Sequence, residues 1–252
     1  MVRISISRPR MAAILMLAGV LVTTLFLAQR YHSSLGFHDI PPPPPHHVFH
    51  TDERLLEDLA IILPVNNNTD MQFYRNTWLR DYLYPVCDWP EPGCKIVCNM
   101  TSTYRTLDKK TICFSRAIKD INDKEFFIKL DDDTFVDRDY VVSLIRHYRG
   151  WSTPVTISDN RRKKDKTNPG VLDGVLYGNG KFYMFNRPLV KCLDTELQYK
   201  GPRNEDSVFG GMVNSGCGEP NVTYVREDDN FIWHKTYVNK NKYIDLAYIK
   251  NH

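Results

Sequence analysis

The apolar run from Phe126 to Leu130, followed at once by Asp131, Asp132 and Asp133, is the feature that most limits how this chain can fold. Five mainly aromatic and aliphatic residues predict a strand that enters a hydrophobic core. Three successive carboxylates at its end concentrate negative charge, which is costly unless a cation binds there. Carboxylate oxygens suit Mg²⁺ or Mn²⁺, and these ions keep open positions for phosphates. The turn is therefore a candidate site for a metal-bound diphosphate.

Two other aspartate-rich motifs do not fit this spacing. A calcium-binding EF-hand loop that began at Asp131 would need a ligand at its fifth position and Gly at its sixth, where the chain has Phe135 and Val136. A phosphatase-type D-x-D-x-T motif would need Thr two residues after Asp133, whereas Thr134 follows it directly. A solvated acidic turn that caps the next helix stays open from the triplet alone.

The amino-terminal segment indicates a membrane anchor. Residues 11–28 carry no charge and follow three arginines. At about 1.5 Å per residue, this segment spans about 27 Å as a helix, enough for a thin bilayer. The arginines predict a cytosolic tail over residues 1–10 and a lumenal remainder. A cleaved signal peptide is the competing interpretation, but Phe26-Leu27-Ala28 is a poor cleavage site, so we favour an uncleaved anchor.

A proline-rich stem over residues 29–50 is expected to link the anchor to a globular domain over residues 51–252. Pro41 to Pro45 favour an extended polyproline spacer. About 200 residues suffice for one domain with a substantial core. The net charge of +3 includes four arginines before residue 31, so the remainder is nearly neutral. A nearly neutral domain has no general attraction for nucleic acid.

Six cysteines and three N-x-Thr sequons agree with an oxidising, glycosylating compartment. The sequons begin at Asn67, Asn99 and Asn221. The cysteines are Cys87, Cys94, Cys98, Cys113, Cys192 and Cys217. Six cysteines allow fifteen full pairings, so the connectivity stays open. A zinc site at Cys94-x-x-x-Cys98 is disfavoured because no His lies near it.

Strands and helices alternate along the predicted domain. Apolar patterning predicts strands over residues 59–65, 96–98 and 126–130. It predicts helices through Arg75 and Trp78, over residues 107–121 and over residues 140–148. Such alternation is typical of a layered α/β domain with a largely parallel sheet. Ligands of open sheets of this kind bind beyond the carboxyl ends of strands, where the three aspartates lie.

Four sequence blocks occur in an order that resembles glycosyltransferase family 31. The blocks are Arg75-Asn76-Thr77-Trp78, Phe127 to Val136, Asn179 to Arg187, and Glu205 to Gly210. This family comprises inverting β-1,3-galactosyl- and N-acetylglucosaminyltransferases and includes Fringe. The resemblance spans about residues 61–234. It implies a GT-A type Rossmann-like layered sheet with flanking helices, preceded by one transmembrane helix, in a single-pass type II protein of the Golgi membrane.

The resemblance also implies a metal and donor site. Asp133 would bind Mn²⁺ or Mg²⁺, which neutralises the diphosphate leaving group of a UDP-sugar. Asp131 and Asp132 would position the ribose and the metal-bound waters. His234 would be a second metal ligand, since imidazole is an accepted ligand for Mn²⁺. A lone His beside Trp233 is more often a packing residue, and that interpretation stays open.

The same resemblance assigns Asp206 as the general base that takes the proton from the acceptor hydroxyl. Without the resemblance, Asp206 would be interpreted as an acidic residue in the first turn of a helix, where the helix dipole stabilises negative charge. The resemblance implies that Arg75 and Gly180, which fall in two of the four blocks, would bind the donor. The family usually has a second Gly where this chain has Phe182, which changes the expected shape of the pocket. The basic segment from Arg161 to Lys166 is either a loop that closes over substrate or a solvated insertion.

Two functions stay open from the sequence. The first is an inverting, metal-dependent enzyme that moves a hexose or N-acetylhexosamine from a UDP-sugar to a hydroxyl of a glycan or glycoprotein, in a β-1,3 linkage as the family forms. The second is an inactive GT-A-fold protein that acts as a lectin-like binder or as a chaperone for another glycosyltransferase. The chain retains Asp131, Asp132, Asp133 and Asp206, and this retention favours the enzyme.

Overall fold

The computed structural model describes residues 53–234, 236–238 and 241–243. The tail, anchor and stem predicted over residues 1–50 lie outside these residues and stay predictions. Within the described ranges, no helix is both long and apolar enough to cross a membrane. The architecture below is therefore that of the domain predicted over residues 51–252.

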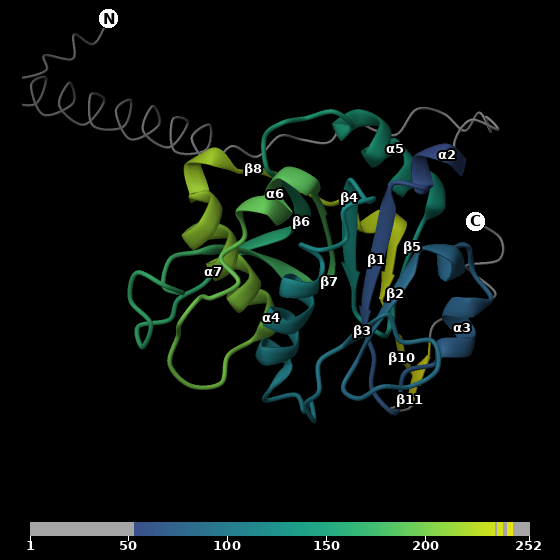
Figure 1. The fold of residues 1–252 in the computed structure, drawn as a ribbon, viewed down its shortest axis with the longest axis horizontal. Helices are drawn as coiled ribbons and strands as arrows, with labels where there is room; N and C mark the ends of the chain where they lie inside the picture. Colours follow the sequence, from purple (N-terminus) through teal and green to yellow (C-terminus); the bar gives the residue numbers. More distant parts are fainter. Residues whose placement is uncertain (1–52, 235, 239–240, 244–252) are drawn as a thin grey trace, which may run out of the picture. The chain divides into compact units, whose positions relative to one another are not determined.

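A seven-stranded sheet forms the centre of the domain, in the order β3-β2-β1-β4-β7-β6-β8 (Figure 1). Its strands are β1 (Leu59–Pro64), β2 (Leu83–Cys87), β3 (Ile96–Val97), β4 (Phe126–Leu130), β6 (Val155–Arg162), β7 (Leu176–Asn186) and β8 (Thr223–Arg226). The first four in sequence run parallel, and β6 runs parallel to β8. Strand β7 is antiparallel to both β4 and β6. The predicted α/β class is confirmed, and the sheet is mixed.

Two short strand pairs lie outside this sheet among the described residues. One pairs β5 (Thr134–Val136) with β9 (Ile232–His234), and the other pairs β10 (Thr236–Val238) with β11 (Asn241–Tyr243). In the first pair Thr134 lies opposite His234. This pairing brings a late histidine next to the acidic turn, although about a hundred residues separate them in sequence.

Helices cover the sheet and connect its strands. The α-helices are α2 (Glu53–Leu56), α3 (Met71–Arg75), α4 (Leu107–Ala117), α5 (Arg138–Tyr148), α6 (Arg187–Cys192) and α7 (Glu205–Cys217). The 3₁₀ turns are η1 (Trp78–Tyr82), η2 (Glu219–Asn221) and η3 (Asp229–Phe231). The single helix predicted through Arg75 and Trp78 is wrong, because Thr77 is extended and its hydroxyl accepts a hydrogen bond from the Leu79 amide, which starts a new turn.

Each face of the sheet packs against helices through its own hydrophobic cluster. On one face Ile61 and Ile128 pack with apolar residues of α5 and α2. On the other, Ile62 and Phe127 pack with apolar residues of α4, α6 and α7. Neighbouring strand residues point to opposite faces, so a strand covered on both sides needs a continuous apolar run. The runs that begin at residues 59 and 126 meet this requirement.

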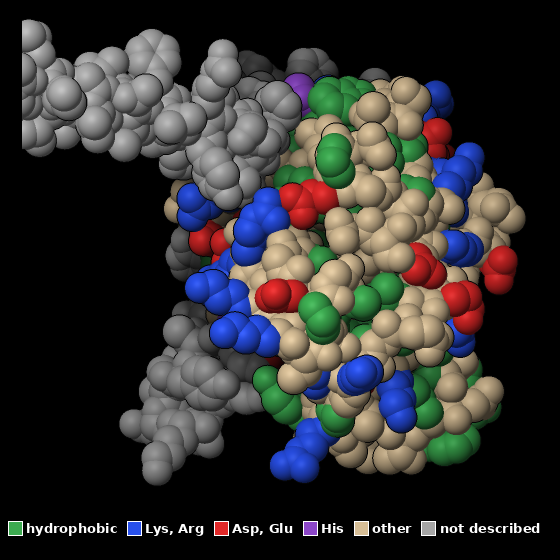
Figure 2. Space-filling view, turned by 90° about the vertical axis from the view of Figure 1, so that its left-hand side faces the viewer, with side chains coloured by type: hydrophobic (Ala, Val, Ile, Leu, Met, Phe, Trp, Pro, Cys, Tyr) green, Lys and Arg blue, Asp and Glu red, His purple; other side chains and the backbone are tan. Residues whose placement is uncertain are grey.

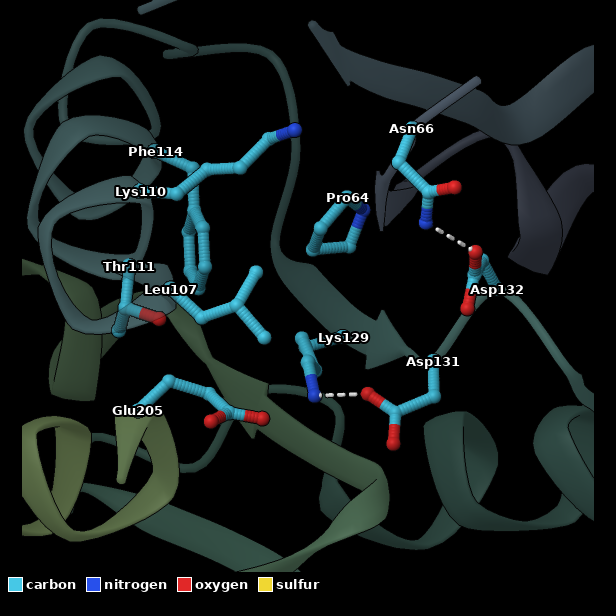
Figure 3. A pocket seen from close by; sticks show the side chains of 10 residues that line it. All are labelled: Pro64, Asn66, Leu107, Lys110, Thr111, Phe114, Lys129, Asp131, Asp132 and Glu205. Carbon is cyan, nitrogen blue, oxygen red and sulfur yellow. Dashed lines mark hydrogen bonds and ion pairs between the residues drawn. The ribbon is translucent and has the colours of Figure 1, made fainter. Parts of the chain in front are cut away.

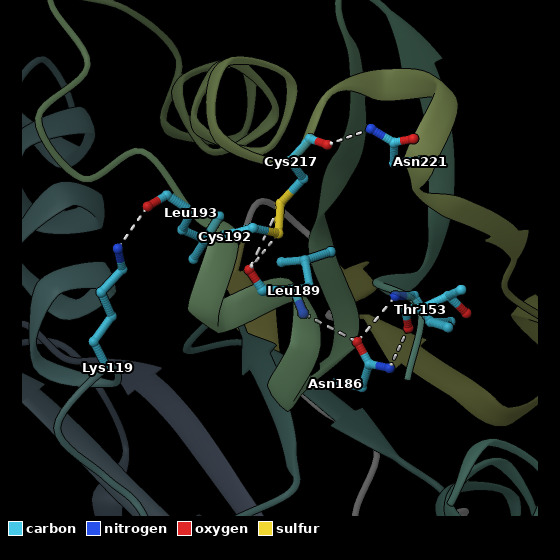
Figure 4. The surroundings of a disulfide bond; sticks show 9 residues. Lys119, Thr153, Asn186, Leu189, Cys192, Leu193, Cys217 and Asn221 are labelled. Carbon is cyan, nitrogen blue, oxygen red and sulfur yellow. Dashed lines mark hydrogen bonds between the residues drawn. A yellow bond between two sulfur atoms is a disulfide. The ribbon is translucent and has the colours of Figure 1, made fainter. Parts of the chain in front are cut away.

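Three disulfides pair all six cysteines, which settles the connectivity. They are Cys87–Cys94, Cys98–Cys113 and Cys192–Cys217. The bond between Cys94 and Cys87 leaves no thiolate for the zinc site that the sequence disfavoured. The third disulfide joins the end of α6 to the end of α7 (Figure 4). It tethers the helix whose first turn carries Asp206, and it stabilises the fold mainly by restricting the unfolded chain.

Candidate metal and base site

The acidic turn after β4 is held by hydrogen bonds to its backbone. The Asp131 amide donates to the carbonyl of Lys181 (3.1 Å), and the Thr134 amide donates to the carbonyl of Asp131 (3.1 Å). The buried Tyr74 hydroxyl lies within hydrogen-bond distance of the carbonyls of Asp131 (3.2 Å) and Thr134 (3.1 Å). The three aspartate side chains therefore extend from a turn whose backbone is held by hydrogen bonds to α3 and β7.

Asp132 is bound by the loop that follows β1. Its Oδ2 accepts hydrogen bonds from Asn66 Nδ2 (2.6 Å) and from the hydroxyl of Thr69 (2.8 Å). Figure 3 shows the contact with Asn66 at the rim of a pocket. The carboxyl ends of β1 and β4 are neighbours in the sheet, and this explains how residues more than sixty positions apart meet.

Asp131, Asp133 and His234 form a candidate metal centre. One ligand atom from each lies within 4.8 Å of the others, and His234 Nε2 is 3.0 Å from Asp133 Oδ1. The pairing of β5 with β9 brings the imidazole to the turn. Two carboxylates and an imidazole fit Mn²⁺ or Mg²⁺ and leave positions for substrate oxygens. The sequence had suggested Asp133 and His234 for this set, and the structure adds Asp131.

Lys129 is a buried cation beneath the turn. It lies in the otherwise apolar strand β4, and its side chain is 2% exposed. Its ammonium pairs with the Asp131 carboxylate and donates to the Gly180 carbonyl (2.8 Å). Burial alone would lower the pKa of Lys129, but the nearby carboxylates, Asp131 foremost, raise it above its ordinary value. Lys129 therefore stays charged inside the domain.

Asp206 lies in the first turn of α7. Asn204 caps this helix, since its Oδ1 accepts a hydrogen bond from the Asp206 amide (2.9 Å). The residue is 4% exposed. Its Oδ2 accepts the Gly180 amide (2.9 Å), whereas its Oδ1 has no hydrogen-bond donor among the described residues and lies 3.8 Å from Lys129 Nζ. Burial raises the pKa of Asp206 to about 7; the charge of Lys129 opposes this, and that of Glu205 adds to it.

Gly180 lies between the metal side and the base side of this site. A Cβ at this position would lie 3.1 Å from Asp206 Oδ2 and 3.3 Å from Asp131 Oδ2. Its amide donates a hydrogen bond to Asp206, and its carbonyl accepts one from Lys129. The absence of a side chain thus lets two carboxylates approach the same stretch of β7.

A pocket opens beyond the carboxyl ends of β1 and β4, beside α4 (Figure 3). Its lining includes Asn66, Lys110, Asp132 and Glu205. Arg75 does not line it. That residue is exposed at the end of α3, and its guanidinium lies near Gly93 instead. The structure thus brings the acidic triplet, Gly180, Asp206 and His234 into one region and leaves Arg75 out of it.

The basic segment from Arg161 to Lys166 continues into a loop that packs on the residues before α7. Asp165 accepts hydrogen bonds from Arg203 Nε (2.7 Å) and from the hydroxyl of Thr167 (2.6 Å). Figure 2 shows Lys and Arg side chains on one face of the domain with Asp and Glu side chains among them. The loop is therefore packed against the segment that precedes α7. The face shown in Figure 2 is not a continuous basic surface.

Sequence patterns did not point to three features of the site. These are the buried Lys129, the pair of Asn66 and Thr69 that binds Asp132, and a second ion-pair cluster of Lys181, Glu227 and Asp229. A lysine inside an apolar strand was the one available signal, since such a residue must find partners when the strand is buried. The other two depend on contacts between distant segments.

Comparisons with known proteins show only distant similarity. No protein-family model matches the chain, and no curated protein matches it. A cytidylyltransferase from Leptospira borgpetersenii serovar Hardjo-bovis aligns at 11% identity with a TM-score of 0.39, over 69% of this chain and 77% of that one. Glucosyl-3-phosphoglycerate synthase from Mycobacterium tuberculosis, in complex with phosphoglyceric acid, aligns at 11% identity with a TM-score of 0.42, over 80% and 81%.

The same synthase in complex with Mn²⁺, UDP-glucose and phosphoglyceric acid aligns at 12% identity with a TM-score of 0.40, over 78% of this chain and 79% of that one. All three TM-scores are below 0.5. They establish neither a family nor a function for this chain, so the proposals below rest on its own residues.

Proposed function

We propose that the chain is an inverting, metal-dependent glycosyltransferase. It moves a hexose or N-acetylhexosamine from a UDP-sugar to a hydroxyl of a glycan or glycoprotein and forms a β-1,3 linkage. One observation carries the proposal: the three-residue candidate metal centre and the buried carboxylate of Asp206 approach the same residue, Gly180, at one edge of an α/β sheet. The sequence resemblance supplies the sugar and the linkage.

The donor side of this proposal rests on the acidic turn. A divalent cation bound there supplies positive charge for the diphosphate leaving group. Asp131, Asp133 and His234 would hold the cation, while Asp132, fixed by Asn66, faces the pocket that receives the nucleoside. The pocket lies beyond strand ends, as ligands of open α/β sheets do.

The acceptor side rests on Asp206. Its Oδ1 accepts the proton of the acceptor hydroxyl, as the hydroxyl oxygen bonds to the anomeric carbon and the bond from that carbon to the diphosphate breaks. UDP leaves from the opposite face, so one displacement inverts the configuration. A pKa of about 7 suits a general base near neutral pH, because efficiency is highest when the pKa matches the working pH.

One observation favours the alternative, an inactive lectin-like binder or chaperone. Asp206 is only 4% exposed and does not line the pocket, so an acceptor hydroxyl reaches it only after a local movement. Glu205, the neighbouring carboxylate, does line the pocket. A protein that binds a nucleotide but does not transfer a sugar would match this burial.

We also propose that residues 11–28 anchor the protein in the Golgi membrane, with the domain in the lumen. Three disulfides that use all six cysteines support an oxidising compartment.

The test is UDP release by the purified full-length chain across a panel of UDP-sugars, with and without Mn²⁺. We expect Mn²⁺-dependent release with one sugar, enhanced by a suitable acceptor. UDP binding without turnover over a broad acceptor panel would support the inactive binder instead. Failure to bind UDP in the presence of Mn²⁺ or Mg²⁺ would overturn the proposal.

A further inference from the structure

Lys129 contacts both halves of the proposed site. Its ammonium pairs with Asp131 of the candidate metal centre, bonds the Gly180 carbonyl (2.8 Å), and lies 3.8 Å from Asp206 Oδ1. Figure 3 shows it pointing from β4 toward Asp131 across the floor of the pocket. A buried ammonium needs such partners, since its removal from water is otherwise unfavourable.

The surroundings of Lys129 leave it few other positions. Its side chain is 2% exposed, and its ammonium lies 5.2 Å from the ring centre of the buried Tyr183. The Gly180 carbonyl is part of the β7 backbone, which pairs with β4 and cannot shift independently of it. The ammonium is therefore a fixed point between two carboxylates that belong to different segments of the chain.

Asp206 depends on two groups for its orientation. The Gly180 amide fixes Oδ2, and Lys129 is the cation in the described part of the chain that forms an ion pair with Oδ1. The 3.8 Å separation is an ion-pair distance and is too long for a hydrogen bond. Oδ1 is thus attracted toward the interior of the site, yet it keeps its capacity to accept a proton from substrate.

We propose that Lys129 is a positioning residue for the transfer step, which holds the carboxylate of Asp206 at a set place relative to Asp131. This inference rests on the proposed function. The donor is held on the Asp131 side and the acceptor is deprotonated on the Asp206 side, so one cation between them sets the alignment of the two substrates. Misplacement of a reacting group by about 1 Å costs up to about a hundredfold in rate.

The test uses the full-length chain with Lys129→Met, which keeps most of the apolar part of the side chain and removes its ammonium group. We expect kcat to fall by about tenfold or more, while the KM for donor and acceptor and the affinity for UDP with Mn²⁺, measured by calorimetry, change much less. The matched control is Lys119→Met. Lys119 donates to the Leu193 carbonyl (2.6 Å) away from the site (Figure 4), and its loss should leave kcat unchanged.

A double-mutant cycle separates positioning from a merely structural role. If Lys129 acts through Asp206, the double variant Lys129→Met/Asp206→Asn transfers sugar as slowly as Asp206→Asn alone and no slower. The double variant also has no uncompensated buried charge on Asp206, so this comparison remains decisive where Lys129→Met by itself does not fold. A double variant that transfers sugar more slowly than Asp206→Asn alone would overturn the inference.

Failure of this inference is distinguishable from failure of the proposed function. Wild-type turnover with an unchanged kcat in Lys129→Met would remove the role of Lys129 and leave the enzyme intact. Absence of wild-type turnover and of UDP binding would remove the function, and the inference with it.

Discussion

Strand β4 has one face that is wholly apolar and one face that also carries charge. Ile128 and Leu130 are fully buried in the hydrophobic cluster that includes α5. Phe127 points to the opposite face, and the alternation continues through Lys129 to Asp131. The hydrophobic effect is non-directional, so side chains on the first face need only a suitable volume and shape. Buried charges need partners at set positions, so substitutions on the two faces should fail in different ways.

Asp133→Ala should have the largest effect on the charged face. It removes one of three ligand atoms from the candidate metal centre, so we expect metal-dependent UDP binding to be lost. Calorimetric titration of UDP with and without Mn²⁺ measures this. Asp123→Ala, an exposed carboxylate just before β4, is the matched control and should bind as the wild type does. Wild-type metal dependence in Asp133→Ala would contradict the assignment.

Ile128→Ala should affect the packing face alone. Truncation of this fully buried side chain leaves a cavity, and we expect the free energy of unfolding to fall by about 2–5 kcal/mol. Denaturant unfolding measures the loss, and the kcat of the folded fraction should stay at the wild-type value. A large drop in kcat with little change in stability would show that the two faces are not separate.

Glu227, a buried carboxyl just after β8 and away from β4, should give the free energy of unfolding a pH dependence. Burial raises its pKa to about 8, although Lys181 opposes the shift. Between the ordinary pKa of a glutamate and about pH 8, the folded state keeps a proton on Glu227 that the unfolded state releases. The contribution of this proton to the free energy of unfolding is complete below the ordinary pKa and is lost as the pH rises through about 8. The loss is at most about 1.4 kcal/mol per pH unit. In Glu227→Gln, the free energy of unfolding should depend less steeply on pH in this window. A slope equal to that of the wild type would contradict the raised pKa of Glu227.

His234→Ala should have the smallest effect of the four. The side chain is 42% exposed, and two carboxylates of the centre remain. We expect a higher Mn²⁺ concentration for half-maximal UDP binding, with binding restored at saturating metal. His147→Ala, on the exposed side of α5, is the control. An identical metal titration for His234→Ala and wild type would remove this histidine from the centre.

Local patterns predicted the elements that depend on neighbouring residues. The structure confirms the strands at the apolar runs that begin at residues 59 and 126. It also confirms the two helices predicted over residues 107–121 and 140–148, which extend over Leu107–Ala117 and Arg138–Tyr148. The break at Thr77 was missed because a capping hydroxyl interrupts a pattern that otherwise remains helical. The antiparallel direction of β7 was also beyond the sequence, since apolar alternation does not encode strand direction.

Candidate site residues could be named from the sequence where they sit at strand ends or in recognisable blocks. The acidic triplet and Asp206 were named on those grounds, and the structure brings Asp131 and Asp206 near Gly180. The contact of Thr69 with Asp132 and the contacts of Lys129 could not be predicted, because they join segments that only the folded sheet brings together. The resemblance assigned Asp131 to the ribose and the metal-bound waters, and the structure places it beside Asp133 and His234 in the candidate metal centre.

The most direct test of the account is Asp206→Asn, measured for both UDP binding and sugar transfer. The amide keeps the size of the carboxylate but is a far weaker base, so we predict UDP affinity near the wild-type value and transfer slower by about a hundredfold or more. Full transfer activity in Asp206→Asn would contradict the claim that this buried carboxylate is the base.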